Sequence, residues 1–239
     1  MIEFKNVSFS YESEKEVIRD LSFTLRDGES VGLIGANGAG KSTVMKLLLG
    51  LVSGRGGITV DGLKLEKTSL PAIRGKIGFV LQNSDDQMFM PTVYEDMMFA
   101  PLNYGMTKEE AERRVDAVLE KLELKALKQR YNHKLSGGEK KMAALATVLA
   151  MEPEAVLMDE PTSALDPYNR RLIIRTIRTL TQTRLIASHD LDMILDCCER
   201  VILLSEGRIT ADGRAEEILR DKELLEANHL ELPLSLSRG

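Results

Sequence analysis

Residues 35–43 have the types and spacing of a phosphate-binding loop. The stretch GANGAGKS fits the pattern G-x-x-x-x-G-K-[ST] at every fixed position, between runs that predict a strand and a helix. Its glycines let backbone N–H groups approach phosphate oxygens, and the following helix directs its positive end at the same place. Lys41 is predicted to reach the β- and γ-phosphates of a nucleotide, and the Ser42 hydroxyl to ligate Mg²⁺. The candidate nucleotide-binding residues of this stretch are Gly35, Ala36, Asn37, Gly38, Ala39, Gly40, Lys41, Ser42 and Thr43.

Two adjacent carboxylates, Asp159 and Glu160, follow a short apolar run at 155–158. Such a run is typical of a strand buried on both faces of a parallel sheet, and ligand sites collect at the carboxyl ends of these strands. Asp159 therefore suits Mg²⁺, directly or through water, and Glu160 can orient and deprotonate an attacking water. By themselves the two carboxylates are equally typical of a solvated loop. Beside a phosphate loop, they predict nucleotide hydrolysis.

The stretch LSGGE at 135–139 is predicted to begin a helix. Ser136 and Glu139 have the spacing of a capping box, which is a purely structural explanation. However, a cap does not require Gly137 and Gly138, because glycine in the first turn weakens a helix. Bare backbone N–H groups at a helix N-terminus also form an anion site. We therefore expect the stretch both to cap its helix and to bind a phosphate.

The elements that must position these residues alternate between strands and helices. Apolar and alternating runs predict strands over 2–11, 20–25, 58–60, 76–81, 155–158, 184–187 and 201–204, with a chain break at 54–57. Helical spacing and caps predict helices over 43–49, from 92, over 107–122, 137–149, 172–180 and 191–198. This order predicts an α/β fold with a mainly parallel sheet. Residues from about 230 are expected to form a loose tail.

Composition limits the classes of function. The chain has 239 residues, 43% hydrophobic and 29% charged, with a net charge of −5 and no long basic run, which argues against a broad nucleic-acid surface. No apolar stretch approaches the ~20 residues of a membrane span, and the N-terminus is unlike a signal peptide. The two cysteines, Cys197 and Cys198, are expected to pack in the core of a protein from a reducing compartment.

With the motifs in this order, the stretch at 135–139 resembles the signature motif of the ATP-binding-cassette (ABC) ATPases, and the resemblance covers about residues 2–220. It implies one cassette domain over 1–239, with a mainly parallel P-loop core, an antiparallel β part and a helical signature subdomain inserted at about 83–150. It also implies a head-to-tail dimer, in which Ser136, Gly137 and Gly138 bind the γ-phosphate of the ATP held by the opposite subunit.

Four further positions match motifs of this family. The resemblance implies that Tyr11 stacks on adenine, that Gln82 senses Mg²⁺ and water, and that Asp166 belongs to the loop linking the two sites. It also implies that His189 contacts the γ-phosphate, although a lone histidine is more often simply packed or exposed. The implied catalytic residues are Lys41, Gln82, Glu160 and His189, and the implied Mg²⁺ ligands are Ser42, Gln82 and Asp159.

The segment after Gln82 is similar to the ATPases of energy-coupling-factor importers, which take up cobalt, nickel or vitamins. The similarity rests on QNSDDQ at 82–87, PTV at 91–93 with Glu95 and Asp96, and PLNYG at 101–105. Ser84 departs from the usual proline, and the C-terminus is shorter than in several members. The resemblance implies a peripheral subunit at the cytoplasmic face of the membrane, paired with a second cassette and separate membrane subunits. The alternatives are a cassette of another importer type or of an exporter and, less favoured, a non-transport cassette ATPase.

The same segment is rich in soft apolar side chains, which adapt to partner helices. We expect it to form a groove for a helix of the membrane subunit. The alternative is that these side chains fill the seam between the helical part and the main sheet. They are Met88, Phe89, Met90, Met97, Met98 and Phe99.

Overall fold

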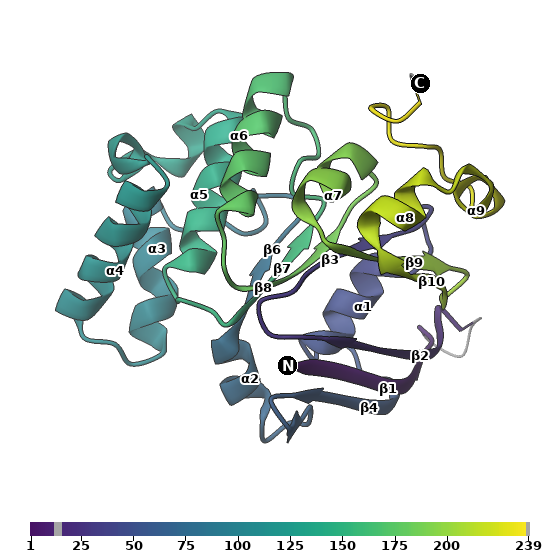
Figure 1. The fold of residues 1–239 in the computed structure, drawn as a ribbon. Helices are drawn as coiled ribbons and strands as arrows, with labels where there is room; N and C mark the ends of the chain where they lie inside the picture. Colours follow the sequence, from purple (N-terminus) through teal and green to yellow (C-terminus); the bar gives the residue numbers. More distant parts are fainter. Residues whose placement is uncertain (12–15, 238–239) are drawn as a thin grey trace.

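Two β-sheets, one antiparallel and one mainly parallel, carry the fold (Figure 1). The computed structural model describes residues 1–11 and 16–237. The antiparallel sheet has the order β2 (Ile18–Leu25), β1 (Ile2–Phe9), β4 (Arg55–Val60), β5 (Leu63–Lys64). The second sheet has the order β10 (Arg208–Arg214), β9 (Arg200–Ser205), β3 (Ser30–Ile34), β8 (Thr183–Ala187), β7 (Ala155–Asp159), β6 (Ile77–Val80).

In the second sheet, five neighbouring strands are parallel and only β10 pairs antiparallel, with β9. Register aligns Leu33 of β3 and Asp159 of β7 with Ala187 of β8. The carboxyl ends of these strands therefore meet at one edge, where the loops after β3, β6, β7 and β8 carry the predicted reactive residues.

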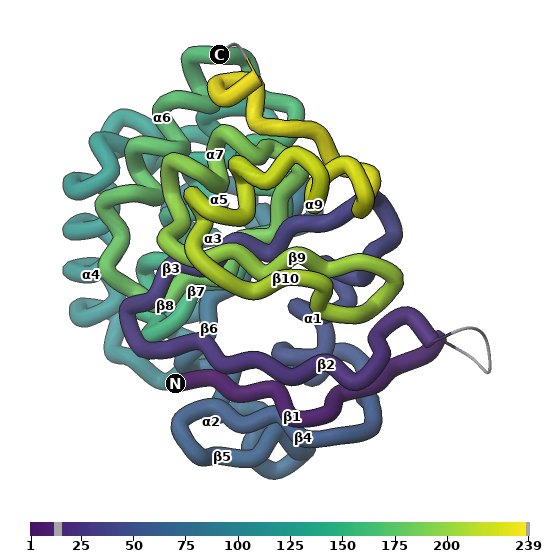
Figure 2. The backbone as a smooth tube through the Cα atoms, turned by 45° about the vertical axis from the view of Figure 1, so that its right-hand side comes forward, coloured from purple at the N-terminus to yellow at the C-terminus, as the bar shows by residue number. Residues whose placement is uncertain are grey.

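The helices cover both faces of this sheet. α1 lies between it and the antiparallel sheet, whereas the segment from α3 to α7 occupies the opposite side (Figures 1 and 2). The helices are α1 (Lys41–Leu48), α2 (Leu70–Lys76), α3 (Val93–Asn103), α4 (Lys108–Lys121), α5 (Gly137–Leu149), α6 (Pro167–Arg178), α7 (Leu191–Cys197), α8 (Ala215–Arg220) and α9 (Lys222–Ala227), with 3₁₀ turns η1 (Lys125–Leu127) and η2 (Asn132–Lys134).

Two apolar cores lie on the two faces of the parallel sheet, because side chains of a strand alternate in direction. Along β7, Val156 and Met158 join the core under α3–α7, whereas Ala155 and Leu157 join the core with α1 and the antiparallel sheet. β7 is buried throughout, as its uninterrupted apolar sequence predicts. The sheet edge that carries the loops is thus supported from both sides.

Several elements differ from the sequence predictions. The predicted break at 54–57 is wrong, because β4 begins at Arg55 and Gly56 (φ 96°) passes within contact of the backbone of Asn6. The short elements α2, β5, β10, α8 and α9 were not predicted. They have six or seven residues, or only two in β5, and tertiary packing rather than a long periodic pattern defines them. Within the described residues, no helix combines the length and apolar character needed to cross a membrane.

The residues from Leu230 follow α9 without a regular element and lie against α7. The backbone N–H groups of Leu234 and Ser235 each donate to the Asp192 carboxylate at 3.0 Å, and Pro233 is buried. Up to Ser237, the expected loose tail is therefore held by specific hydrogen bonds.

Candidate nucleotide-binding and hydrolytic site

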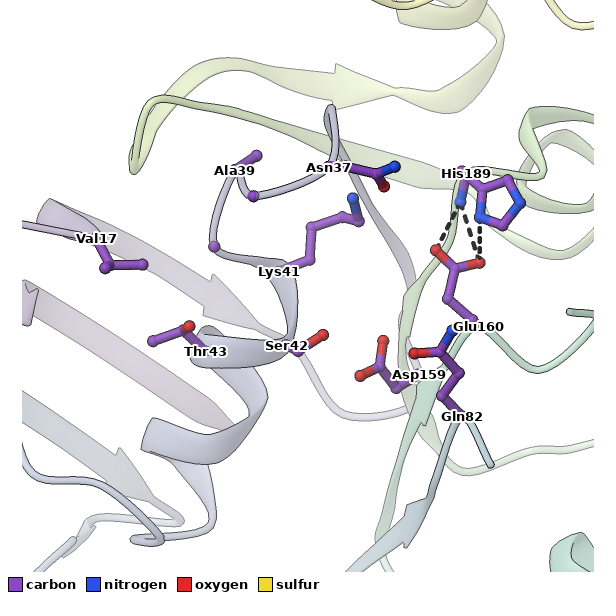
Figure 3. A pocket seen from close by; sticks show the side chains of 12 residues that line it. Val17, Asn37, Ala39, Lys41, Ser42, Thr43, Gln82, Asp159, Glu160 and His189 are labelled. Atoms are coloured by element: carbon purple, nitrogen blue, oxygen red, sulfur yellow. Dashed lines mark hydrogen bonds and ion pairs between the residues drawn. The ribbon is translucent and has the colours of Figure 1, made fainter. Parts of the chain in front are cut away.

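A cavity of about 540 Å³ opens at the loop-bearing edge of the parallel sheet. Figure 3 shows the phosphate loop and α1 on one side of it, with residues that follow β6, β7 and β8 facing them. Most of the residues that line the cavity were predicted from the sequence. They come from several separate segments of the chain. The lining residues are Val17, Asn37, Gly38, Ala39, Gly40, Lys41, Ser42, Thr43, Gln82, Asp159, Glu160 and His189.

The loop between β3 and α1 depends on glycine at both of its ends. A Cβ on Gly35 would lie 2.2 Å from the Leu204 carbonyl oxygen, so no side chain fits there. Gly40 has a φ of 109° immediately before α1, in the left-handed region that favours glycine. This geometry turns the chain sharply into α1 and leaves the first N–H groups of the helix facing the cavity.

Lys41 is largely buried at the start of α1 and is bound to its own loop. Its Nζ donates to the carbonyl oxygen of Gly35 at 2.6 Å and to that of Ala36 at 3.2 Å. Burial lowers the pKa of the Lys41 ammonium, and attraction to Glu160 and Asp159 opposes this shift. Phosphate oxygens entering the cavity would replace neutral carbonyl partners with charged ones, which form stronger hydrogen bonds.

Ser42, Gln82 and Asp159 place three oxygen-bearing side chains around one part of the cavity (Figure 3). Burial raises the pKa of the Asp159 carboxyl, while the Ser42 hydroxyl lowers it. The described residues contain no cluster of three or more His, Cys, Asp or Glu side chains suited to a metal. This donor set fits Mg²⁺, which prefers oxygen and takes most of its ligands from water and phosphate.

Glu160 lies directly after β7 with its carboxylate enclosed by the loop after β8. Oε2 accepts a hydrogen bond from the Ser188 hydroxyl at 2.9 Å, and Oε1 accepts one from the His189 backbone N–H at 3.1 Å. The His189 ring Nδ1 lies 2.8 Å from Oε2. The structure thus brings the predicted base and the predicted histidine into direct contact at the cavity (Figure 3).

Tyr11 does not line the cavity but lies at its margin. Its ring is 41% exposed and packs edge-on against Phe9, and its hydroxyl lies 3.5 Å from the Thr43 hydroxyl. The structure therefore places a partly exposed aromatic ring beside Thr43, and its stacking on adenine stays a prediction. Val17, which lines the cavity, was missed, because a single apolar residue beside a strand gives no sequence signal.

The stretch Ser136–Gly138 lies outside this cavity, in the first turn of α5. Ser136 and Glu139 form the complete capping box that the sequence predicted. The two glycines differ: a Cβ on Gly137 would meet nothing within 4 Å, whereas one on Gly138 would lie 2.1 Å from the Asn169 side chain. Gly138 therefore permits close packing with α6, and Gly137 leaves the helix N-terminus open.

Asp166 also lies outside the cavity and caps α6. Its Oδ1 accepts hydrogen bonds from the backbone N–H groups of Tyr168 at 2.9 Å and Asn169 at 3.1 Å. Hydrogen bonds from Asn169, by side chain and backbone, lower the pKa of the Asp166 carboxyl. Because Asn169 also packs on Gly138, the loop of Asp166 and the first turn of α5 form one continuous surface.

Two further polar residues near the cavity were missed. Ser188 follows β8 at the same sheet edge as Glu160, so the strand-end argument applied to Glu160 could have identified it. Lys141 lies in the interior of α5 and reaches the backbone of Gln82, a contact that spans 59 residues of sequence and leaves no local signal.

Comparison with known proteins gives a consistent result along the whole chain. A model of the ABC transporter family matches residues 18–163. A provisionally named ABC transporter ATP-binding protein of Geobacter sulfurreducens is 44% identical over 237 residues, covering 99% of this chain and 95% of the relative. The energy-coupling factor transporter ATP-binding protein EcfA of Methanothermobacter thermautotrophicus is 43% identical over 239 residues, covering 98% of this chain and 77% of that protein.

Solved structures agree with the fold. The cbiO1 protein of Clostridium perfringens, part of the ABC transporter complex cbiONQ, superposes with a TM-score of 0.85 at 30% identity, covering 99% of this chain and 97% of that one. A dimeric ATP-binding cassette in a post-hydrolysis state with bound ADP and Pi gives a TM-score of 0.79 at 28% identity. The superposition covers 90% of this chain and 99% of that one. The predicted fold class is confirmed.

Proposed function

The chain belongs to the ABC transporter family as an ATP-binding subunit with ATPase activity, and we propose that it powers an energy-coupling-factor-type importer for cobalt, nickel or a vitamin. The observation that carries this proposal is its 43% identity to EcfA over 98% of the chain. The likeness to cbiO1 supports the same subtype. Other similar relatives carry only the general name of ABC transporter ATP-binding proteins, so the subtype rests on these two proteins and on the segment after Gln82.

The proposed chemistry is transfer of the γ-phosphoryl group of ATP to water. Lys41 would exchange its carbonyl partners for phosphate oxygens, and the α1 N-terminus would bind the remaining phosphate charge. Glu160 would orient the attacking water and take its proton, with Ser188 and His189 holding the carboxylate in place. Ser42, Gln82 and Asp159 would hold Mg²⁺, which neutralises charge on the phosphate oxygens.

The open first turn of α5 supports a site shared between two chains. Ser136–Gly138 belongs to a different part of the molecule from the cavity, and nothing in the described chain fills the space beside Gly137. The free backbone N–H groups at the N-terminus of α5 suit a phosphate presented by another subunit. We therefore propose a dimer of cassettes, with a second copy or a related chain, in which each α5 closes the partner's ATP site.

A surface groove supports docking of a membrane subunit. The cavity beside α3 measures about 230 Å³ and includes Phe89 and Phe99, which are 63% and 42% exposed and pack edge-to-face at 4.8 Å. In contrast, Met88, Met97 and Met98 are buried in the core under α3–α7, as the seam alternative predicted. The phenylalanines thus remain available to a partner helix, which would place the protein peripherally at the cytoplasmic face of the membrane.

Replacing both phenylalanines with aspartate tests this proposal. We expect Phe89→Asp/Phe99→Asp to retain ATP binding but to lose co-purification with co-expressed membrane subunits of the energy-coupling-factor type, together with uptake of labelled Co²⁺, Ni²⁺ or vitamin. Leu102→Asp is the matched control, because Leu102 is 44% exposed on the same helix but does not line the groove. An intact complex in the double variant would refute the docking site, and uptake of none of these solutes by the wild type would refute the importer subtype.

A further inference from the structure

Lys141 is a buried cation that the proposed hydrolysis does not use. It lies on α5, five positions after Ser136, and is only 4% exposed. Its Nζ donates to the Gln82 carbonyl oxygen at 2.6 Å and lies 3.5 Å from that of Leu81. Among residues 1–11 and 16–237, no carboxylate forms an ion pair with it within 4 Å.

The electrostatic surroundings of Lys141 connect it to the cavity. Burial lowers the pKa of its ammonium, and attraction to Asp159 and Glu160 opposes that shift. A buried ammonium satisfied by carbonyls rather than by a counter-ion is costly, and an apolar side chain of similar length is often as stable or more stable in such a place. The buried charge of Lys141 therefore costs stability, which favours a role in the site over a role in folding.

We propose that Lys141 is a positioning residue that fixes the backbone of Gln82 and ties it to α5. By holding the Gln82 carbonyl, it sets the direction of the side chain that lies beside Asp159 and faces Ser42 across the cavity (Figure 3). The same helix carries Ser136–Gly138 on its first turn, toward the site of the partner chain. Through Lys141, the Mg²⁺-facing glutamine of one site and the phosphate-facing turn of the other therefore move as one unit.

Two neighbouring residues, Gln87 and Lys140, reinforce this unit without replacing Lys141. The side-chain Nε2 of Gln87 donates to the Ala144 carbonyl oxygen at 2.7 Å, and the side-chain Oε1 of Gln87 accepts a hydrogen bond from the Leu81 backbone N–H at 3.0 Å. Lys140 pairs with Asp85 at the surface. Lys141 contacts Gln82 itself. Replacing Lys141 should therefore loosen Gln82, while Gln87 and Lys140 keep the rest of the segment attached to α5.

The test uses Lys141→Met, which keeps the unbranched shape and all but one atom of the length of the side chain and removes its charge and donors. We expect the unfolding temperature to be unchanged or higher and the ATP affinity to be unchanged. Because the Gln82 side chain is then misplaced, kcat should be about 10- to 100-fold lower, and half-maximal hydrolysis should need a higher Mg²⁺ concentration. Amide hydrogen exchange across residues 81–83 should become faster. Lys140→Met, the neighbouring control, should change these quantities far less, because it removes an ion pair whose Asp85 partner is 68% exposed and leaves the contact with Gln82 intact.

The inference rests on the proposed function, but the exchange measurement separates the two. Unchanged exchange at 81–83 in Lys141→Met, or a fall in activity only in proportion to lost stability, would overturn the role of Lys141. If instead the wild type hydrolyses no ATP while Lys141→Met still shows faster exchange across residues 81–83, the proposed function is refuted and the role of Lys141 is not.

Discussion

Glu160 adopts a left-handed backbone conformation, with a φ of 48°, at the point where β7 ends. This conformation is uncommon for a residue with a side chain, and here it turns the carboxylate back toward Ser188 and His189. These contacts fix the direction of the carboxylate, as the proposed role of a general base requires.

Glu160→Gln should abolish most of the hydrolysis without preventing ATP binding. The amide keeps the shape of the side chain but cannot take a proton, so kcat should fall by about 10²- to 10⁴-fold, the usual contribution of a general base. Glu154→Gln is the control, because this exposed carboxylate precedes the same strand at its other end. Wild-type kcat in Glu160→Gln, measured as phosphate release, would remove Glu160 from the role of base.

The two cysteines should be unreactive in the folded protein. Burial raises the pKa of the Cys197 and Cys198 thiols to about 12 in each case, so almost no thiolate exists at pH 8. An aromatic disulfide reagent at pH 8 should therefore react slowly with native protein and rapidly with both thiols after unfolding. Rapid reaction of a native thiol would contradict the packing of α7 against the core.

Among the elements, the first turn of α5 contains two glycines with different roles. One allows close helix packing, and the other leaves the helix N-terminus accessible. Gly138 lets α5 approach α6 through Asn169, and Gly137 keeps the N-terminus accessible. The pair Gly138→Ala and Gly137→Ala separates packing from access.

Gly138→Ala should destabilise the protein by about 1–3 kcal/mol, the usual effect of overpacking. Gly137→Ala should leave the free energy of unfolding unchanged or raise it by up to about 1 kcal/mol, since alanine restricts the unfolded chain. If the turn faces a partner's phosphates, Gly137→Ala should still lower ATP hydrolysis. Denaturant unfolding and phosphate release measure the two effects, and equal destabilisation by both substitutions would contradict the packing described here.

The phosphate loop and β7, which carry the cavity, and the neighbouring helix α5 were predictable from sequence because each has a local signal. The loop at 35–42 has fixed glycines, β7 has an unbroken apolar run, and α5 has a complete capping box. The short helices α2, α8 and α9 lack such signals, since six or seven residues gain their stability from tertiary contacts. The contacts of Lys141 with Gln82 and of Gly138 with Asn169 depend on how α5 packs, which no local pattern encodes.

At the scale of the whole molecule, the cavity and the open turn of α5 are separate features joined by one helix. The cavity lies at the edge of the parallel sheet, where Lys141 of α5 contacts Gln82 in its lining, and Thr147 and Val148 of the same helix line the groove of Phe89 and Phe99. A partner in the groove and nucleotide in the cavity would thus act on the same helix. This arrangement offers a physical route from ATP binding to a membrane subunit.

In the proposed dimer, each hydrolytic site combines the phosphate loop of one chain with the α5 turn of another. Equimolar mixing of two variants expected to be inactive, Lys41→Ala and Ser136→Arg, tests this arrangement by single-turnover ATP hydrolysis. A mixed dimer contains one site with an intact loop and an intact turn, so random pairing should restore about a quarter of the wild-type sites. No recovery beyond the sum of the separate variants, or full activity of Ser136→Arg alone, would contradict a site shared between two copies of this chain.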